Sequence, residues 1–224
     1  MGSTRLAGGG IGRLLPVYVD APRSTTSNRT VKHVFDRVGA ALALLVLGPL
    51  ILVLALAVRL TSRGPAFYLP PRIGLYGRAF RMVKLRTMEV GADDAKADLA
   101  VALGSPRLFK MVDDPRVTDL GRLLRRWSLD ELPQLLNVLW GDMSFVGPRP
   151  LPPDEAAAAN AQVTRRLLVR PGITGLWQVS GRSDLPWEEC VRLDLQYVDN
   201  WSLSLDAQIL LRTTVAVLRH EGAY

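Results

Sequence analysis

The chain has 224 residues, of which 48% are apolar, and a formal charge of +7 from 28 basic and 21 acidic residues; this length fits one medium domain, alone or with an anchor, and the charge suits a polyanionic partner such as nucleic acid, an anionic membrane face or a nucleotide-like substrate. A single cysteine, Cys190, excludes an internal disulfide, and two histidines far apart in the sequence argue against a zinc site built from Cys and His. Because no Gly-x-Ser-x-Gly motif supports a histidine triad, nucleophilic or acid–base chemistry falls to carboxylates.

The N-terminal part of the chain divides into a polar tail and an apolar run. Residues 1–31 are rich in Gly, Ser, Thr, Arg and Pro, which predicts a flexible tail. Residues 39–58 carry no charge, and a helix of about 20 residues spans roughly 30 Å, the thickness of a membrane core. Basic residues flank both ends of this run, so their distribution does not predict its orientation.

Gly48 and Pro49 interrupt the apolar run near its middle. Pro49 has no N–H to donate to the carbonyl of Leu45, and its ring crowds that turn, so a kink is expected. One interpretation is a helix–break–helix hairpin that enters one leaflet and returns. The other is a kinked helix that spans the bilayer, since proline is tolerated in such helices.

Residues 80–88, "FRMVKLRTM", predict a β-strand after a turn formed by Gly74 and Gly77. In a strand, Lys84 and Arg86 share one face, and two cations on one face suit a phosphate group. The alternative is an exposed strand edge that its charges protect from further pairing.

Apolar residues recur at helical spacing along residues 116–127, and the arginines of this segment lie mostly off that stripe. The pattern fits either an interfacial membrane helix or an amphipathic helix on a soluble core. The other expected elements are helices at 154–169, 186–198 and 204–219 and a short strand at 176–179. The part of the chain after the apolar run is therefore expected to be mixed α and β.

Asp130 and Glu131 lie side by side in "SLDELPQLLN". The structural interpretation is a capping box, in which Ser128 accepts from the Glu131 amide and the Glu131 side chain reaches back. Pro133 compromises that register, because it would lie inside the first helical turns and lacks a donor. The helix would then begin nearer Pro133, and the two acids would be available for chemistry.

Arginines flank the two acids on both sides. Arg125 and Arg126 precede them, and Arg149 follows between two prolines in "GPRP". A guanidinium on so restricted a backbone suits a phosphate, although Arg149 is equally consistent with an ordinary surface loop.

Four segments together resemble the bacterial sugar transferases, that is, the polyprenyl-phosphate hexose-1-phosphate transferases or monotopic phosphoglycosyl transferases. The segments are "KLRTM", "DPRVTDLGRLLRRWSLDELPQLLNVLWGDMSFVGPRP", "VRPGITGLWQVSGR" and "LDLQYVDNWSLSLDAQILLRTTVAVLRHEGAY", and the resemblance runs from Lys32 to Tyr224. The sequence departs from the family pattern at Pro70, where a Gln is usual, and at Gly48, where many members have Ser.

The resemblance implies an α+β fold with three parts. These are a flexible N-terminal tail (1–31), a re-entrant membrane hairpin broken at Gly48–Pro49 (32–63), and a phosphoglycosyl transferase domain (64–224). The domain would lie on the cytoplasmic face of the bacterial inner membrane, with amphipathic helices at the membrane lipids and a small sheet. Because longer relatives carry transmembrane helices and another domain upstream, the chain is expected to be the minimal catalytic unit.

The resemblance also implies a mechanism and its residues. Asp130 attacks the β-phosphorus of a UDP-sugar, UMP leaves, and polyprenyl phosphate (undecaprenyl phosphate is expected) takes the sugar phosphate from Asp130. Asp130 is the implied Mg²⁺ ligand, Glu131 is its partner, and Arg149 and Arg125 match functional arginines of the family. Weaker candidates for phosphate binding are Lys84, Arg86 and Arg170.

Three other functions remain open from the residues alone. A membrane-anchored nucleic-acid-binding protein would also be basic, but the sequence has no helix-turn-helix or RNP pattern, so no nucleic-acid partner is expected. A scaffold without catalysis would use the two acids only as a cap. A Mg²⁺-dependent hydrolase of nucleotide sugars would turn over without a lipid acceptor.

Overall fold

The computed structural model describes residues 26–92, 114–158, 161–181 and 185–219. The α-helices are α1 (Thr26–Thr61), α3 (Asp119–Arg126), α4 (Leu135–Trp140), α5 (Pro153–Ala157), α6 (Ala161–Arg165), α7 (Trp187–Asn200) and α8 (Leu203–Arg219). The strands are β1 (Phe67–Tyr68), β2 (Pro71–Ile73), β3 (Ala79–Arg81), β4 (Lys84–Leu85), β5 (Ser144–Val146) and β6 (Gly172–Thr174). The 3-10 helices are η1 (Leu75–Gly77), η2 (Leu129–Gln134), η3 (Arg166–Leu168) and η4 (Trp177–Val179). The predicted mixture of α and β is confirmed.

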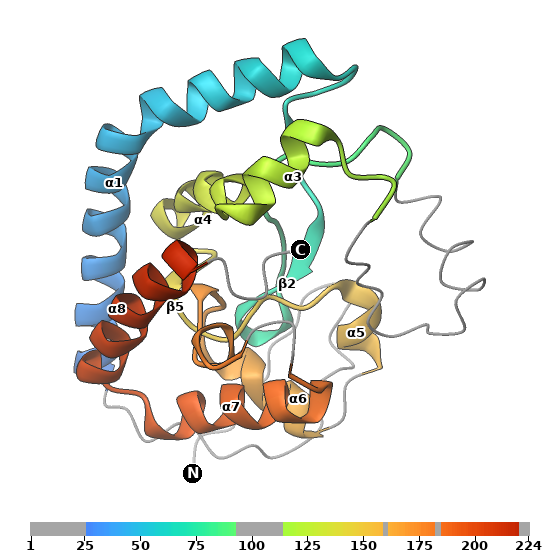
Figure 1. Cartoon of the computed structure of the whole chain (residues 1–224). Helices are drawn as coiled ribbons and strands as arrows, with labels where there is room; N and C mark the ends of the chain where they lie inside the picture. Colours follow the sequence, from blue (N-terminus) through green and yellow to red (C-terminus); the bar gives the residue numbers. More distant parts are fainter. Residues whose placement is uncertain (1–25, 93–113, 159–160, 182–184, 220–224) are drawn as a thin grey trace.

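Helix α1 runs along one side of the molecule and bends near its middle, so that its second part crosses the top of the view in Figure 1. Pro49 is the proline within this helix, and a proline removes one helical hydrogen bond and bends the axis. The predicted interruption at Gly48–Pro49 is therefore a bend in one helix. Because α1 begins at Thr26, residues 26–31 belong to the helix and not to the predicted tail; residues 1–25 of that tail lie outside the described residues.

Both halves of α1 pack against the same domain. In the first half, Ala40 is fully buried in a cluster that includes Val138 of α4. In the second half, Ala55 and Val58 are buried with Leu85 of β4 and Leu124 of α3. The bend lets the helix follow the surface of the domain over its whole length.

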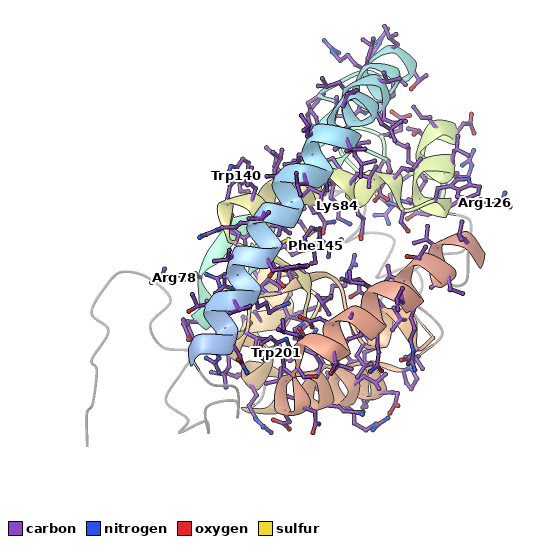
Figure 2. All side chains as sticks on the ribbon, turned by 90° about the vertical axis from the view of Figure 1, so that its left-hand side faces the viewer. Arg78, Lys84, Arg126, Trp140, Phe145 and Trp201 are labelled. Atoms are coloured by element: carbon purple, nitrogen blue, oxygen red, sulfur yellow. The ribbon has the colours of Figure 1, made fainter. Side chains whose placement is uncertain are left out.

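The other face of α1 is apolar and exposed. Leu45, Val46 and Leu52 are 77%, 74% and 69% exposed, far more than is usual for large apolar side chains. Within the described residues, α1 is the helix long and apolar enough to cross a membrane. Figure 2 views the molecule from this side, with Trp140 of α4 and Phe145 of β5 labelled along the helix.

The sheet structure consists of three separate two-stranded pairs. β1 pairs with β4 and β2 with β3, both antiparallel, and β5 pairs with β6 in parallel. The single strand predicted at 80–88 is thus split between β3 and β4, with Met82 and Val83 both buried in the connection. Strand pairs this short are stabilised by the helices packed on them.

Two predicted elements in the C-terminal half are wrong and two are confirmed. The helix predicted at 154–169 is broken into α5, α6 and η3, and the segment predicted as a strand at 176–179 contains η4, while the strand β6 comes earlier. The helices predicted at 186–198 and 204–219 correspond to α7 and α8.

Hydrogen bonds hold α7 and α8 to the start of α1. The Tyr197 hydroxyl donates to Asp206 Oδ1 (2.7 Å) and also lies 2.9 Å from the carbonyl oxygen of Val146. The other oxygen of Asp206 accepts from Lys32 Nζ (2.6 Å) and Trp201 Nε1 (3.1 Å). Asp206 thereby links three helices at the lower end of α1.

Candidate active site

Asp130 and Glu131 lie on η2, in the short connection between α3 and α4. Thr118 caps α3 by accepting from the Gly121 amide (2.9 Å), and Ser128 then takes a left-handed conformation with φ of 55°. The Ser128 side chain makes no capping bond, so the alternative interpretation as a capping box does not hold. Pro133 lies within η2 and α4 begins two residues later, as expected from its missing donor.

Glu131 takes the short ion-pair contacts, and Asp130 does not. Glu131 Oε1 lies 2.7 Å from Lys84 Nζ and 3.3 Å from Arg149 Nη2, whereas Lys84 Nζ stays 4.0 Å from Asp130 Oδ2. Both acidic side chains are largely buried, with exposed fractions of 11% for Asp130 and 19% for Glu131. Asp130 is therefore a buried carboxylate among cations that are bound mainly to its neighbour.

The surroundings move the two carboxyl pKa values in opposite directions. Burial raises the pKa of Asp130 to about 6, against the attraction of Lys84. Burial alone would also raise the pKa of Glu131, but the charges and hydrogen bonds of Lys84 and Arg149 outweigh it and lower the pKa to about 2. Neighbouring acids with separated pKa values are typical of catalytic sites, although structural ion pairs can produce them too.

Arg125 adds a positive charge beside Asp130, and Arg72 adds one beside Arg149. Arg125 Nε donates to Thr87 Oγ1 (2.9 Å), which directs its guanidinium, and its charge acts on Asp130. Arg72 of β2 was not predicted as a site residue; burial, and then the positive charge of nearby Arg149, lower its pKa. The sequence signal for Arg72 was its place in "PRIG", just before the turn glycine Gly74.

The loop that carries Arg149 is held by close backbone contacts. The Gly147 amide donates to the Thr174 carbonyl and the Gly172 amide to the Pro148 carbonyl, both at 2.9 Å. A Cβ on Gly147 would lie 2.4 Å from the carbonyl oxygen of Arg170, so only glycine allows this approach.

A buried ion pair supports the same loop from behind. Arg166 Nη2 lies 2.6 Å from Asp194 Oδ2, and both side chains are almost fully buried. The same nitrogen donates to the carbonyl of Arg149 (3.2 Å), and the guanidinium lies 5.5 Å from the centre of the Trp187 ring. Burial raises the pKa of Asp194 to about 7, against the attraction of Arg166. This pair fixes the main chain from which Arg149 reaches Glu131.

Asn137 connects the helix after the two acids to the strand that carries Lys84. Its Oδ1 accepts from the Val83 amide and its Nδ2 donates to the Arg81 carbonyl, both at 2.8 Å. Asn137 is fully buried, and its amide is used on both sides. The one signal in the sequence was a polar residue inside the apolar run "LLNVLW".

Arg86 and Arg170 are not part of this site. Arg86 donates to the carbonyls of Pro65 (2.6 Å), Ser62 (3.2 Å) and Met88 (3.4 Å), and so closes the loop after α1. The Arg86 guanidinium is buried among these main-chain acceptors, so its contacts give no support to the predicted role in phosphate binding. Arg170 donates to the Gly141 carbonyl (2.7 Å) and contacts His33 at the start of α1.

The donor set around Asp130 fits a Mg²⁺ ion that is shared with a substrate, and it does not form a metal cage. Among the described residues, no group of three or more Asp, Glu, His or Cys side chains could hold a metal. Mg²⁺ commonly binds through one or two carboxylates, with phosphate oxygens and water completing its octahedron. Asp130 is the acid left without a short ion pair, so it is the residue that would hold the ion.

The fold and the site together define a class of protein: an α+β domain with an apolar helix along it and a buried acid among arginines and a lysine, suited to phosphate chemistry. Residues 27–220 match the model of the family described as "Bacterial sugar transferase". The chain belongs to the bacterial sugar transferase family, as the resemblance implied.

Named relatives cover most of this chain. It is 44% identical over 199 residues to the galactosyl transferase CpsE of Streptococcus agalactiae and 42% identical over 203 residues to the undecaprenyl-phosphate galactose phosphotransferase of Salmonella typhimurium. Each match includes 88% of this chain but only 44% and 42% of the relative, so the chain spans less than half their length. It is also 42% identical over 200 residues to the exopolysaccharide production protein ExoY of Rhizobium meliloti, with 86% of this chain and 88% of that protein covered.

Proposed function

We propose that the chain transfers a sugar 1-phosphate from a UDP-sugar to polyprenyl phosphate, giving polyprenyl-diphosphate-sugar and UMP. The observation that carries the proposal is that the nearby cations form short ion pairs with one acid and not with the other. Glu131 accepts the ion pairs of Lys84 and Arg149, while Asp130 is buried and keeps a distance of 4.0 Å from Lys84. A carboxylate without a short ion pair, surrounded by cations, can attack a phosphate that those same cations bind.

In the first step, an oxygen of Asp130 attacks the β-phosphorus of the UDP-sugar. The bond between that phosphorus and the bridging oxygen breaks, UMP leaves with the bridging oxygen, and the sugar phosphate remains on Asp130 as an acyl phosphate. With a pKa of about 6, Asp130 is about nine-tenths ionised at pH 7, and burial keeps it less solvated than a surface carboxylate.

Arg149 and Lys84, which contact Glu131, would bind the diphosphate, and Arg72 lies near Arg149. Arg149 is 39% exposed at its side chain, so a ligand can reach it, and its contact with Glu131 holds it beside Asp130. A planar guanidinium binds two phosphate oxygens at once, which orients the phosphorus for attack. Mg²⁺, when bound, would neutralise charge on the phosphate oxygens.

In the second step, a phosphate oxygen of polyprenyl phosphate attacks the same phosphorus and Asp130 leaves as a carboxylate. One diphosphate linkage is broken and one is formed, so the exchange needs no other energy source. Glu131, held by two cations, would keep the acceptor phosphate and Lys84 in position. The Streptococcus and Salmonella relatives, both named for galactose, support a hexose as the sugar.

The apolar outer face of α1 supports a place in the membrane, and we propose that the helix enters one leaflet and returns on the cytoplasmic side of the inner membrane. Both halves of α1 pack on one domain, which supports a hairpin over a spanning helix. Leu123 of α3 and Trp127, which follows the helix, are 51% and 40% exposed, and this supports a place for α3 at the membrane surface. In a Cys190→Ser background, cysteines at Asn28 and Arg63 should react with a reagent added to the same side; opposite sides would refute the hairpin.

Transfer itself is tested by incubating the purified chain with polyprenyl phosphate, Mg²⁺ and a panel of radiolabelled UDP-sugars. One sugar should label the lipid fraction, Asp130→Asn should abolish the label, and Asp119→Asn, at a 95% exposed acid on α3, should leave it unchanged. Continuous UMP release without polyprenyl phosphate would identify a hydrolase. Failure of all the sugars to label lipid would overturn the proposal.

A further inference from the structure

A second basic site lies away from Asp130, where the start of α1 meets the end of α7. A cavity of about 80 Å³ opens between these helices and the segment that follows η3. Four basic side chains and two exposed or half-buried aromatic side chains are among those lining it: Arg29, Lys32, His33, Arg170, Tyr76 and Trp201. Figure 2 places Trp201 beside the lower end of α1. Neither acid of the active site lines this cavity.

The residues that line the cavity include three cations, Arg29, Lys32 and Arg170, and no acid. Lys32 is neutralised by Asp206 at 2.6 Å, with Asp36 a further 3.8 Å contact. Arg170 donates to the main-chain carbonyl of Gly141, and the charges of Arg37, Asp36 and Asp142 also act on it. Arg29 adds a further cation.

The pKa of His33 is sensitive to the positive charges around the cavity. Burial, and then the charges of Arg170, Lys32 and other nearby arginines, lower the pKa of His33 to about 4. The imidazole is therefore neutral at physiological pH and can donate one hydrogen bond without adding charge. An anion bound beside it would offset the neighbouring cations and raise this pKa.

The position of the cavity along α1 indicates the depth at which it meets a membrane. His33 lies six residues before the uncharged run begins at residue 39, which is about 9 Å along a helix. On the outer side of the same turn, Val34 and Phe35 are 58% and 69% exposed, an unusual state for apolar side chains in water. Lipid that covers Val34 and Phe35 would place its headgroups beside the cations on the inner side.

We propose that this cavity binds the phosphodiester headgroup of an anionic phospholipid of the membrane in which α1 lies. Arg170 and Arg29 would pair with the phosphate oxygens, His33 would donate a neutral hydrogen bond, and Trp201 and Tyr76 would contact the lipid at the polar–apolar boundary. The bound lipid would fix the N-terminal end of α1 on the domain. This inference requires α1 to lie in a membrane, but it does not depend on the proposed transfer reaction.

The test compares two variants that remove equal charge from opposite flanks of the apolar run. Arg29→Gln with Arg170→Gln changes the cavity; Arg59→Gln with Arg63→Gln changes exposed arginines beyond the other end. Dihexanoyl phosphatidylglycerol, the matching phosphatidylcholine and inorganic phosphate are titrated separately into each full-length protein in neutral detergent.

Wild type and the Arg59/Arg63 variant should bind phosphatidylglycerol saturably, and the cavity variant should bind it at least about tenfold more weakly, because two charge-assisted contacts are lost. If both variants bound phosphatidylglycerol equally weakly, the loss would reflect the total charge of the protein, and the proposal of a specific site would be overturned. Equal affinity for inorganic phosphate, or preference for polyprenyl phosphate in competition, would overturn the assignment to a membrane phospholipid.

A second readout follows the wild-type protein, and a variant serves only to assign its imidazole signals. The chain has two histidines, and the imidazole signals of His33 and His220 are told apart with His33→Gln. Phosphatidylglycerol should raise the pKa of His33, and phosphatidylcholine should leave it unchanged. An unmoved pKa under saturating phosphatidylglycerol would contradict the proposal, whatever the result of the transfer assay.

Discussion

Replacing each acid of the active site by its amide should change stability in opposite directions. At 1.36 kcal/mol per pH unit, a pKa raised from 3.8 to about 6 means that ionising Asp130 costs the folded protein about 3 kcal/mol more than the unfolded chain. Asp130→Asn removes that cost. Glu131 has the opposite shift, from 4.5 to about 2, so Glu131→Gln removes about 3 kcal/mol of stabilisation and leaves Lys84 and Arg149 without their acceptor.

Thermal denaturation in detergent, followed by tryptophan fluorescence at pH 7, measures both effects. For a domain of this size about 3 kcal/mol corresponds to roughly 6–12 °C, upward for Asp130→Asn and downward for Glu131→Gln. The Asp130→Asn gain should shrink as the pH falls from 7 to 4, because the cost exists above the folded pKa of about 6 and is absent below the unfolded value of 3.8. If the melting temperatures of the two variants shifted in the same direction, the account would be refuted. It requires that ion pairs stabilise the charge of Glu131 and that burial destabilises the charge of Asp130.

Three further predictions concern the same site. The rate of covalent labelling by UDP-sugar should fall as the pH is lowered through about 6, because the attacking form of Asp130 is the carboxylate; a flat rate down to pH 4.5 would contradict the raised pKa. Asn137→Ala should cost about 2–5 kcal/mol in chemical denaturation, because it leaves a buried amide and a buried carbonyl unpaired, and a loss below about 1 kcal/mol would contradict that role. Arg166→Lys should lower kcat/KM for UDP-sugar about tenfold, mainly through KM, since it frees the main chain at Arg149; Arg165→Lys, in the exposed pair with an acid of α7, is the matched control and should have no effect.

Local sequence patterns predicted the helices well where apolar periodicity decided the structure. The apolar run before residue 58, the segment at 204–219 and the proline-induced bend followed from elementary rules. Ser128 shows where such rules fail. The spacing to Glu131 fits a capping box, but Glu131 forms its contacts with Lys84 and Arg149, which are distant in sequence. Tertiary ion pairs therefore replaced a local cap.

The two acids of the candidate site were predicted from the sequence, and the basic residues around them were predicted less well. Asp130 and Glu131 were found from a motif. That motif could not predict which of the two acids pairs with the nearby cations. Lys84 and Arg86 were given the same role because a continuous strand would place them on one face. Strand β4 ends at Leu85, and Lys84 reaches the acids while Arg86, just beyond the strand, is enclosed by carbonyls. The buried amide of Asn137 holds the main chain of Arg81 and Val83 just before Lys84, and these partners could not be predicted from one polar residue in an apolar helix.

The central claim is that Asp130 becomes covalently bonded to the sugar phosphate, and a direct mass measurement tests it. The wild-type chain is mixed with the UDP-sugar in the absence of polyprenyl phosphate, quenched in acid, digested and mapped by mass spectrometry. The account predicts one sugar phosphate per chain on Asp130, released as lipid-linked sugar when polyprenyl phosphate is added before the quench. Transfer to lipid at full rate with no adduct on Asp130, or with the adduct on another residue, would contradict it.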